Sequence, residues 1–186
     1  LRAAIRANRG HRALFAWYTI DEPVGDKFAR CTEAYRICLE EDPNHPTFLV
    51  SCDPSQFTAL APAVDILGID PYPIGHTALS IVGQWSRSVE QVVADDGSER
   101  NGAQTWMLVP QAHNQDGYQD PTHGRAPTPD EEWAMVAAGL ARGAKGLVYY
   151  PWEDGRLGLA HDPTLRAEVA AINALHRRVG VQGVTA

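Results

Sequence analysis

The sequence has few cysteines, few basic residues and no long apolar run. The three cysteines, Cys31, Cys38 and Cys52, show neither a zinc-site spacing nor a disulfide framework, so we expect all three to be buried structural residues. There are 16 Lys and Arg against 23 Asp and Glu, a net charge of −7, which argues against nucleic-acid partners and anionic membrane surfaces. No stretch approaches the ~20 apolar residues of a membrane span.

Length and composition predict one domain. The chain has 186 residues, of which 44% are hydrophobic, and this is enough to bury a core of its own. We therefore expect residues 1–186 to form a single domain. No glycine-rich phosphate loop follows any predicted strand, which argues against a nucleotide-binding fold. Nothing in the sequence indicates a cellular compartment.

Strand and helix patterns alternate along the chain. Apolar runs predict buried strands at residues 13–20, 47–52, 64–69, 104–109 and 145–150. Helical spacing predicts helices over residues 26–41, 78–94, 129–142 and 163–178. Thr128, Pro129 and Glu131 match a capping box with proline at the first helical position. This order predicts an α/β fold with parallel strands, either an open sheet or a barrel.

Polar or aromatic side chains follow every predicted strand. In chain order they are Asp21 with Glu22, Asp53, Asp70 with Tyr72, Gln111 with His113, and Tyr150 with Trp152 and Glu153. In a (β/α)8 barrel the carboxyl ends of the strands meet on one face, where active sites are built. Five strands cannot close such a barrel, so we expect a partial TIM (β/α)8 barrel of five β/α units, with the first three units missing upstream of Leu1.

Four motifs occur in a characteristic order: WYTIDEP at residues 17–23, DPNHP at 42–46, VDILGIDPYP at 64–73, and GAKG followed by YY at 143–150. Together they resemble the catalytic barrels of clan A glycoside hydrolases. In that clan the fourth strand ends in Asn-Glu-Pro, whose Glu is the general acid/base, and the seventh ends in a Glu nucleophile. The resemblance covers nearly the whole chain. It implies hydrolysis of O-glycosidic bonds of a saccharide, with no metal or organic cofactor, and an N-terminal barrel half that is missing.

The chain departs from the clan pattern at two positions. Asp21 stands where the clan usually has Asn, and Gln111 stands where the nucleophilic Glu is expected. An amide cannot form the glycosyl-enzyme ester of a retaining mechanism. The two-glutamate assignment therefore does not transfer as a whole.

Glu22 is the candidate general acid. Cleavage needs a carboxylic acid that keeps its proton near neutral pH, and burial beside the second carboxylate of Asp21 favours that form. Glu153, Asp70, or a carboxylate of the missing half would then act as base or nucleophile. The alternative is a carboxylate pair that simply faces solvent at a strand end.

The remaining candidates are substrate contacts around this acid. They are Asp21, Trp17, Asp70, Tyr72, Gln111, His113, Tyr150 and Trp152. Trp152 suits a platform on which the CH face of a pyranose stacks. Residues 17 and 18 alternate along a strand, so only one of them can point into the barrel. The polar segment 114–127 is either a binding loop, with Tyr118 and Arg125 as contacts, or a solvated linker.

Three functions stay open at this point. The first is a glycoside hydrolase that uses Glu22. The second is a non-catalytic carbohydrate-binding barrel of the same ancestry, because Gln111 replaces the nucleophile. The third is a scaffold domain without a ligand.

Overall fold

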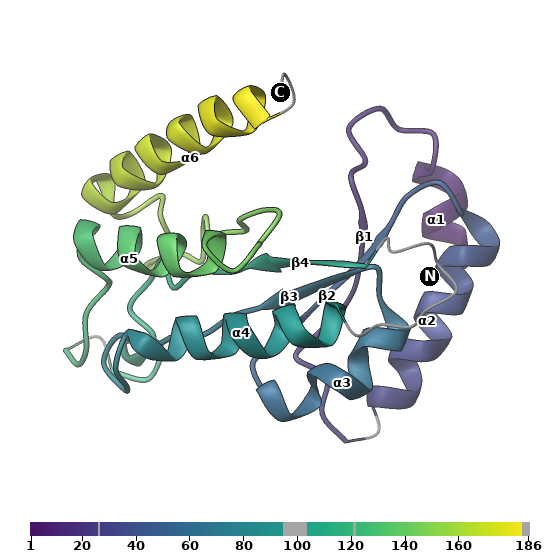
Figure 1. Cartoon of the computed structure of the whole chain (residues 1–186), viewed down its shortest axis with the longest axis horizontal. Helices are drawn as coiled ribbons and strands as arrows, with labels where there is room; N and C mark the ends of the chain where they lie inside the picture. The colour runs from purple at the N-terminus through teal and green to yellow at the C-terminus, as the bar shows by residue number, and fades with distance from the viewer. Residues whose placement is uncertain (26, 95–103, 121, 184–186) are drawn as a thin grey trace.

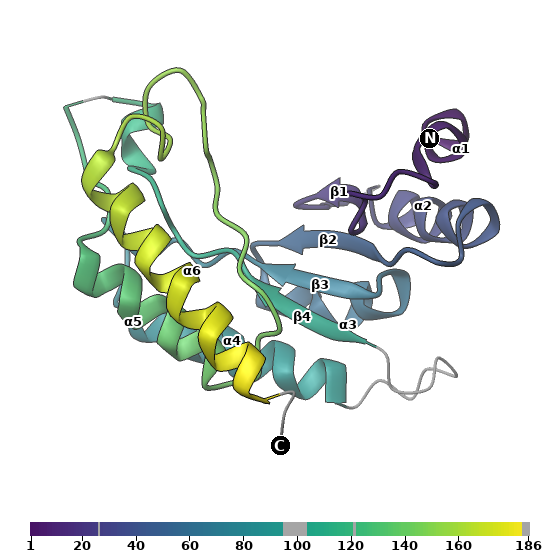
Figure 2. The same cartoon turned by 90° about the horizontal axis from the view of Figure 1, so that it is seen from above.

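Four parallel strands form the sheet of this protein, in the spatial order β1-β2-β3-β4 (Figures 1 and 2). The computed structural model describes residues 1–25, 27–94, 104–120 and 122–183. The strands are β1 Trp17–Asp21, β2 Thr47–Ser51, β3 Ile66–Ile69 and β4 Thr105–Leu108. The helices are α1 Arg2–Asn8, α2 Lys27–Glu41, α3 Phe57–Leu60, α4 Ser80–Ala94, α5 Pro129–Leu140 and α6 Pro163–Gly183, with short 3-10 turns η1 Pro54–Gln56, η2 Ala61–Ala63 and η3 Asp116–Tyr118.

Helices connect the successive strands, because parallel neighbours need a crossover. α2 joins β1 to β2, α3 lies between β2 and β3, and α4 joins β3 to β4. The predicted α/β alternation is confirmed, and this sheet is compatible with part of an α/β barrel. The capping box that starts α5 is confirmed as well, with the Thr128 hydroxyl accepting from the Glu131 N–H and the Glu131 carboxylate accepting from the Thr128 N–H.

The predicted fifth strand at residues 145–150 is wrong as an element. This segment runs beside β4 and the residues that follow it, and it forms two isolated parallel bridges, Leu108 with Leu147 and Gln111 with Tyr150. The sheet of the described residues therefore has four strands. The first strand is also shorter than expected, because residues 11–14 form turns on the surface and β1 begins only at Trp17.

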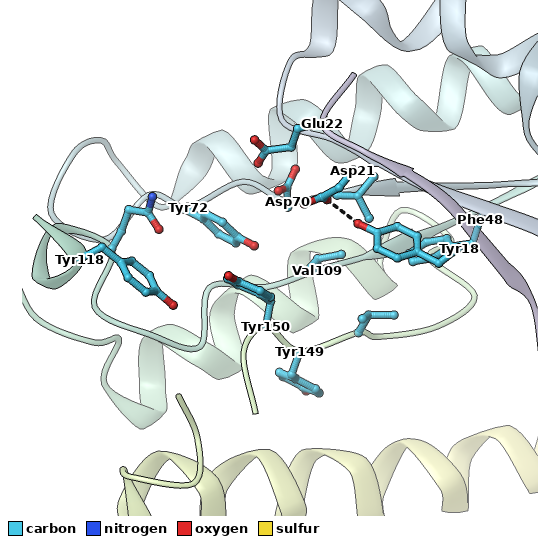
Figure 3. A pocket seen from close by; sticks show the side chains of 13 residues that line it. Tyr18, Asp21, Glu22, Phe48, Asp70, Tyr72, Val109, Tyr118, Tyr149 and Tyr150 are labelled. Atoms are coloured by element: carbon cyan, nitrogen blue, oxygen red, sulfur yellow. Dashed lines mark hydrogen bonds between the residues drawn. The ribbon is translucent and has the colours of Figure 1, made fainter. Parts of the chain in front are cut away.

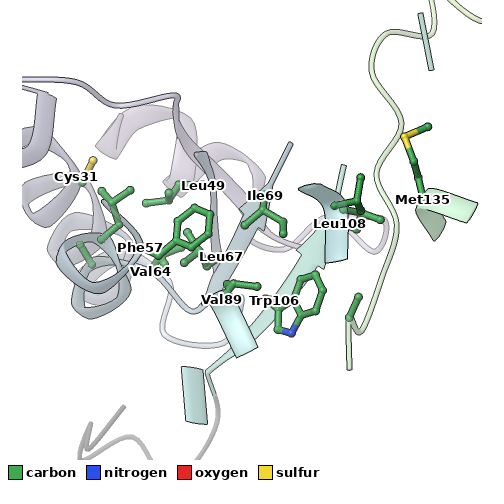
Figure 4. Close-up of a cluster of buried hydrophobic side chains, with 14 residues drawn as sticks. Cys31, Leu49, Phe57, Val64, Leu67, Ile69, Val89, Trp106, Leu108 and Met135 are labelled. Atoms are coloured by element: carbon green, nitrogen blue, oxygen red, sulfur yellow. The ribbon is translucent and has the colours of Figure 1, made fainter. Parts of the chain in front are cut away.

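The hydrophobic core lies between one face of the sheet and the helices (Figure 4). Alternate strand residues point toward the helices, as the two-residue period of a strand requires. Leu49, Leu67 and Trp106 are aligned across three strands by the parallel register, and all three are buried. They pack with Val89 of α4 and Met135 of α5 in one cluster.

The opposite face of the sheet carries Phe48 and Val50 of β2 and Gly68 of β3. A Cβ atom at Gly68 would lie 2.8 Å from both the Phe48 ring and Val50 Cγ2, so the aromatic ring closes over the glycine. Phe48 also stacks on Tyr18, with ring centroids 5.2 Å apart. This face is therefore lined by aromatic side chains.

Two of the three cysteines are buried and one is exposed. Cys31 and Cys38 are buried free thiols, as expected, whereas Cys52 is exposed because it follows the end of β2. The prediction of a buried Cys52 is wrong.

None of the helices formed by the described residues is long and apolar enough to cross a membrane.

Candidate active site

A pocket of about 590 Å³ opens at the carboxyl ends of the strands (Figure 3). Its walls are formed by acidic, aromatic and aliphatic side chains, namely Tyr18, Asp21, Glu22, Phe48, Val50, Asp70, Tyr72, Val109, Gln115, Tyr118, Val148, Tyr149 and Tyr150. The size is typical of a small-molecule site. Of the predicted site residues, Asp21, Glu22, Asp70, Tyr72 and Tyr150 line this pocket together.

Glu22 is held at the rim by an unusual backbone conformation. Its φ is +40°, in the left-handed region that costs a non-glycine residue about 1–2 kcal/mol. The register of β1 against β2 is irregular between Tyr18 and Asp21, and the Glu22 N–H donates to Val50 O at 3.0 Å. This irregular end of β1 directs the Glu22 carboxylate toward Asp70 (Figure 3).

Asp70 is the buried member of this carboxyl pair. Only 4% of the residue is exposed, and its Oδ1 has no hydrogen-bond partner among the described residues. Burial, then hydrogen-bond contact with Glu22 and the nearby charges of Glu22 and Asp21, raises the pKa of Asp70 to about 9. The Asp70–Glu22 pair therefore holds a proton at neutral pH.

Asp21 is the exposed member of the acidic rim. The Tyr18 hydroxyl donates to Asp21 Oδ1, and burial followed by this hydrogen bond raises the pKa of Tyr18. Tyr18 is therefore the residue of the Trp17–Tyr18 pair that faces the pocket. Trp17 lies outside the pocket, because its indole N–H donates to Asp42 Oδ2 at 2.9 Å.

The motif around Asp42 has a structural task. The buried Asp42 also contacts His45 Nδ1 at 2.7 Å and the Asn44 N–H at 3.3 Å. Burial alone would raise the pKa of Asp42, but the hydrogen bonds from Trp17 and His45 outweigh it and lower the pKa. The sequence DPNHP thus anchors the start of β1 instead of contributing to the pocket.

Three tyrosines surround the buried His113 on the other side of the pocket. The ring centroid of His113 lies 4.9 Å from that of Tyr72, 5.5 Å from Tyr118 and 5.6 Å from Tyr150. Its Nδ1 is 3.0 Å from Tyr150 O, and its Nε2 is 2.6 Å from Gln115 Oε1. His113 is fully buried and does not line the pocket, so it supports the wall from behind.

Gln111 also lies behind the wall. Its side chain accepts from the Ile74 N–H at 2.8 Å and donates to His113 O at 3.1 Å, and the residue is fully buried. These contacts join the turn after β3 to the segment after β4. Gln111 was expected to contact substrate, but its amide is engaged by the backbone and it does not line the pocket.

The predicted candidates beyond Tyr150 lie outside the pocket. Trp152 is 61% exposed and Glu153 is also exposed. Glu153 accepts from the Gly155 N–H at 2.6 Å and contacts His161 Nε2 at 2.7 Å. Arg125 of the long loop pairs with Glu131, also away from the pocket.

Glu153, Asp154 and His161 form an exposed cluster whose ligand atoms all lie within 4.8 Å of one another. Asp154 Oδ1 accepts from the backbone N–H groups of three following residues, and Asp154 Oδ2 accepts from the Tyr118 hydroxyl at 2.7 Å. These carboxylates therefore stabilise a surface loop.

Sequence reasoning did not select several lining residues. Five of them are aromatic or aliphatic and one is an amide: Phe48, Val50, Val109, Val148, Tyr149 and Gln115. The two-residue period of the strands marks Phe48 and Val50 as neighbours on one face, which is the signal that could have found them. Gln115 carries no such signal because it lies in a loop.

No model of a protein family matches the sequence, and no curated protein matches it. Solved structures of glycosidases do share its fold. A candidate α-L-fucosidase from Bacteroides thetaiotaomicron has a TM-score of 0.60 at 11% identity, over 81% of this chain and 51% of the other. A β-D-glucuronidase from Dictyoglomus thermophilum has a TM-score of 0.56 at 14% identity, over 81% of this chain and 28% of the other.

A β-galacturonidase from Eisenbergiella tayi, solved with galacturonate bound, has a TM-score of 0.53 at 17% identity, over 80% of this chain and 28% of the other. The chain thus spans about half or less of the length of these structures. At such low identity the likeness establishes a glycoside hydrolase-like fold.

Proposed function

We propose that this chain is part of a glycoside hydrolase that binds a saccharide in the pocket and cleaves an O-glycosidic bond with Glu22 as general acid. The observation that carries the proposal is the contact of Glu22 with Asp70 at the carboxyl ends of the strands, where burial raises the pKa of Asp70 to about 9. Protonation of the leaving oxygen requires an acid that still holds its proton near neutral pH. The Asp70–Glu22 pair supplies that proton.

The geometry of the pair favours a shared proton over two opposed catalytic carboxylates. The two carboxyl groups of a retaining glycosidase lie about 5–5.5 Å apart, and those of an inverting one about 6.5–9.5 Å apart. Glu22 and Asp70 are in hydrogen-bond contact, which is closer than either arrangement. Asp70 thus acts on Glu22, and the opposing base or nucleophile comes from the part of the barrel that this chain does not span.

The remaining walls suit a sugar. Tyr72, Tyr118 and Tyr150 line one side. Burial raises the pKa of Tyr72, so that its hydroxyl keeps its proton and can donate to a sugar hydroxyl, whereas the Tyr118 hydroxyl donates to Asp154 and can only accept from the sugar. Phe48 and Tyr18 offer aromatic faces for the CH groups of a pyranose ring.

A second candidate function is carbohydrate binding without cleavage. It is favoured by Gln111, which occupies the position expected for the nucleophile and whose amide is buried and bonded to backbone groups. The pocket would then hold a saccharide through the same tyrosines and carboxylates. Saturable binding of a sugar would distinguish this function from that of a scaffold domain without a ligand.

The deciding experiment measures release of a chromogenic aglycone by the full-length protein and by its Glu22→Gln variant. A general acid typically contributes about 100- to 10,000-fold, so we expect a loss of that size. Glu153→Gln is the matched control, because it removes an exposed carboxylate outside the pocket. Equal rates for Glu22→Gln and the unmodified protein would remove Glu22 from the mechanism, and saturable sugar binding without any release would establish the binder.

A further inference from the structure

The distribution of charge around the pocket narrows the substrate class. We propose that the sugar ring bound here carries no carboxylate, so that the site accepts neutral or amino sugars and rejects uronic acids. This inference rests on the proposed function, because it concerns the same pocket.

The lining contains acids but no bases. Asp21, Glu22 and Asp70 all contribute carboxyl groups, while none of the 13 lining residues is Lys, Arg or His. The polar remainder consists of tyrosine hydroxyls and the Gln115 amide. A guest therefore meets negative charge and neutral hydrogen-bonding groups, with no cation on the described walls.

Three basic side chains contact lining residues or their sequence neighbours, and each has a hydrogen-bond or ion-pair partner. His113 lies behind the tyrosines with both ring nitrogens in hydrogen-bond contact. Arg156 donates to Gly117 O at 2.7 Å, and His76 pairs with Asp116 at 3.1 Å. None of these three side chains lines the pocket, so a bound carboxylate meets no cation on the described walls.

The acidic lining of this pocket argues against a uronic-acid ligand, although two structures with a similar fold are named for uronic acids. Two of the structural neighbours are a β-glucuronidase and a β-galacturonidase with galacturonate bound. Taking a carboxylate out of water is costly unless charged or N–H donors replace the lost hydration, and like charges placed together disfavour binding further. Asp21 would face a uronate with the same sign of charge, and the Asp70–Glu22 pair offers no compensating cation.

The same walls fit uncharged sugars. Carboxylate oxygens accept hydrogen bonds from sugar hydroxyls, and the hydroxyls of Tyr72 and Tyr150 can donate or accept. A protonated amino group in place of one hydroxyl would pair with Asp21 or Glu22 by a charge-assisted hydrogen bond. Amino sugars are therefore expected to bind at least as well as neutral ones.

The test compares matched methyl glycosides of a neutral hexose, the corresponding hexosamine and the corresponding hexuronic acid. Glucose, galactose and mannose configurations are each titrated calorimetrically at neutral pH into the unmodified full-length protein as thio-linked methyl glycosides, which resist cleavage and leave the acidic lining intact. In the configuration that binds, we expect the uronide to be weaker than the neutral glycoside by about tenfold or more, a factor that corresponds to about 1.4 kcal/mol.

Two controls assign the difference to charge. Asp21→Asn and a rise to about 1 M salt should each reduce the gap about threefold or more, because both weaken the like-charge repulsion. Glu33→Gln, which removes an exposed carboxylate of α2 far from the pocket lining, should leave the gap unchanged.

The outcomes separate the two proposals. A uronide that binds as tightly as the neutral glycoside, or more tightly, overturns the substrate class but leaves saccharide binding in place. A gap that neither Asp21→Asn nor salt alters would assign the rejection to shape and overturn the charge argument. Absence of binding by every sugar overturns the proposed function and this inference with it.

Discussion

The described residues include two acidic clusters. The acidic rim of the pocket consists of Asp21, Glu22 and Asp70, and the exposed acidic loop contains Glu153 and Asp154. The two clusters carry the same kinds of side chain but differ in burial and in hydrogen bonding. In the rim, Asp70 is buried with an unpartnered oxygen, and its pKa is raised by burial and by Glu22. In the loop, the hydrogen bond from His161 lowers the pKa of Glu153, and hydrogen bonds from Tyr118 and backbone N–H groups outweigh burial and lower that of Asp154. The loop carboxylates have hydrogen-bond partners, whereas the buried Asp70 Oδ1 has none among the described residues.

This difference indicates which cluster is available for chemistry. A carboxylate that already accepts several hydrogen bonds gives up stability if it binds a ligand, while a buried acid beside a second carboxylate can transfer a proton. Both clusters follow strand-like segments rich in aromatic residues. Burial, not position in the sequence, separates them.

The largest expected effect on the cleavage rate comes from replacing Asp70, the buried acid of the rim. Asp70→Asn should lower glycoside cleavage at neutral pH by about 100-fold or more, because Glu22 loses the partner with which it shares a proton. Asp70 loses its proton at high pH, so cleavage by the unmodified protein should also fall as the pH rises through about 9, the pKa of Asp70. Initial rates across pH 5–10 measure both.

The matched change in the loop is Asp154→Asn, which should change cleavage by less than about threefold. A comparable loss in both variants would erase the distinction between rim and loop. An Asp70→Asn protein that keeps its rate and its alkaline limb would exclude Asp70 from proton transfer.

The second prediction applies the same contrast to adjacent residues of α5. Glu132 is fully buried with both carboxylate oxygens unpartnered among the described residues, and burial raises its pKa to about 8 from an ordinary value of 4.5. The folded state thus holds a proton that the unfolded chain releases. Stability should therefore fall as the pH rises from about 4.5 to about 8, by up to about 1.4 kcal/mol per pH unit.

Glu132→Gln should remove this part of the pH dependence, as denaturant midpoints at pH 6 and pH 8 would measure. Glu131 is the control, because hydrogen bonding to Arg125 outweighs burial and lowers its pKa to about 2. Its contribution is present above pH 4.5 and is lost as the pH falls, so Glu131→Gln should leave the alkaline loss intact. If the difference between the Glu132→Gln and unmodified proteins stays constant between pH 6 and pH 8, Glu132 does not retain its proton.

The third prediction compares His113, which lies behind the pocket wall, with His161 of the exposed loop. His113→Phe preserves an aromatic ring but leaves Tyr150 O and the Gln115 amide without their buried partner, which should cost about 1–3 kcal/mol of unfolding free energy. It should also weaken sugar binding, because Tyr72 and Tyr150 pack on this ring. His161→Phe in the exposed loop should cost less than about 0.5 kcal/mol. Urea unfolding measures both, and equal costs would contradict a supporting role for His113.

Much of the arrangement was predictable from the sequence because parallel strands repeat the same chemistry. The carboxyl ends of parallel strands meet on one face, and these ends, or the residues just after them, supply Asp21, Glu22, Asp70, Tyr72 and Tyr150. The capping box of α5 was predictable for a similar reason, since it depends on neighbouring residues alone.

The rest depends on contacts between distant segments. Whether Trp17 or Tyr18 faces the pocket is decided by Asp42, which binds the indole from 25 positions away. Gln111 is withdrawn from the pocket by the backbone of Ile74, 37 positions away. Glu153 stays outside because its loop closes on itself through the Gly155 N–H. No local pattern encodes these partners.

The smallest predicted effect concerns Tyr118, whose side chain joins the two regions. It lines the pocket while its hydroxyl donates to Asp154 Oδ2 at 2.7 Å. Tyr118→Phe removes this hydrogen bond and one acceptor for a sugar hydroxyl, so binding should weaken by about two- to tenfold, the effect of one neutral hydrogen bond. Asp154→Asn keeps the hydroxyl in the pocket and should weaken binding less. If Asp154→Asn weakens sugar binding as much as Tyr118→Phe does, the loop acts on the ligand by orienting Tyr118, and rim and loop must then be treated as one site.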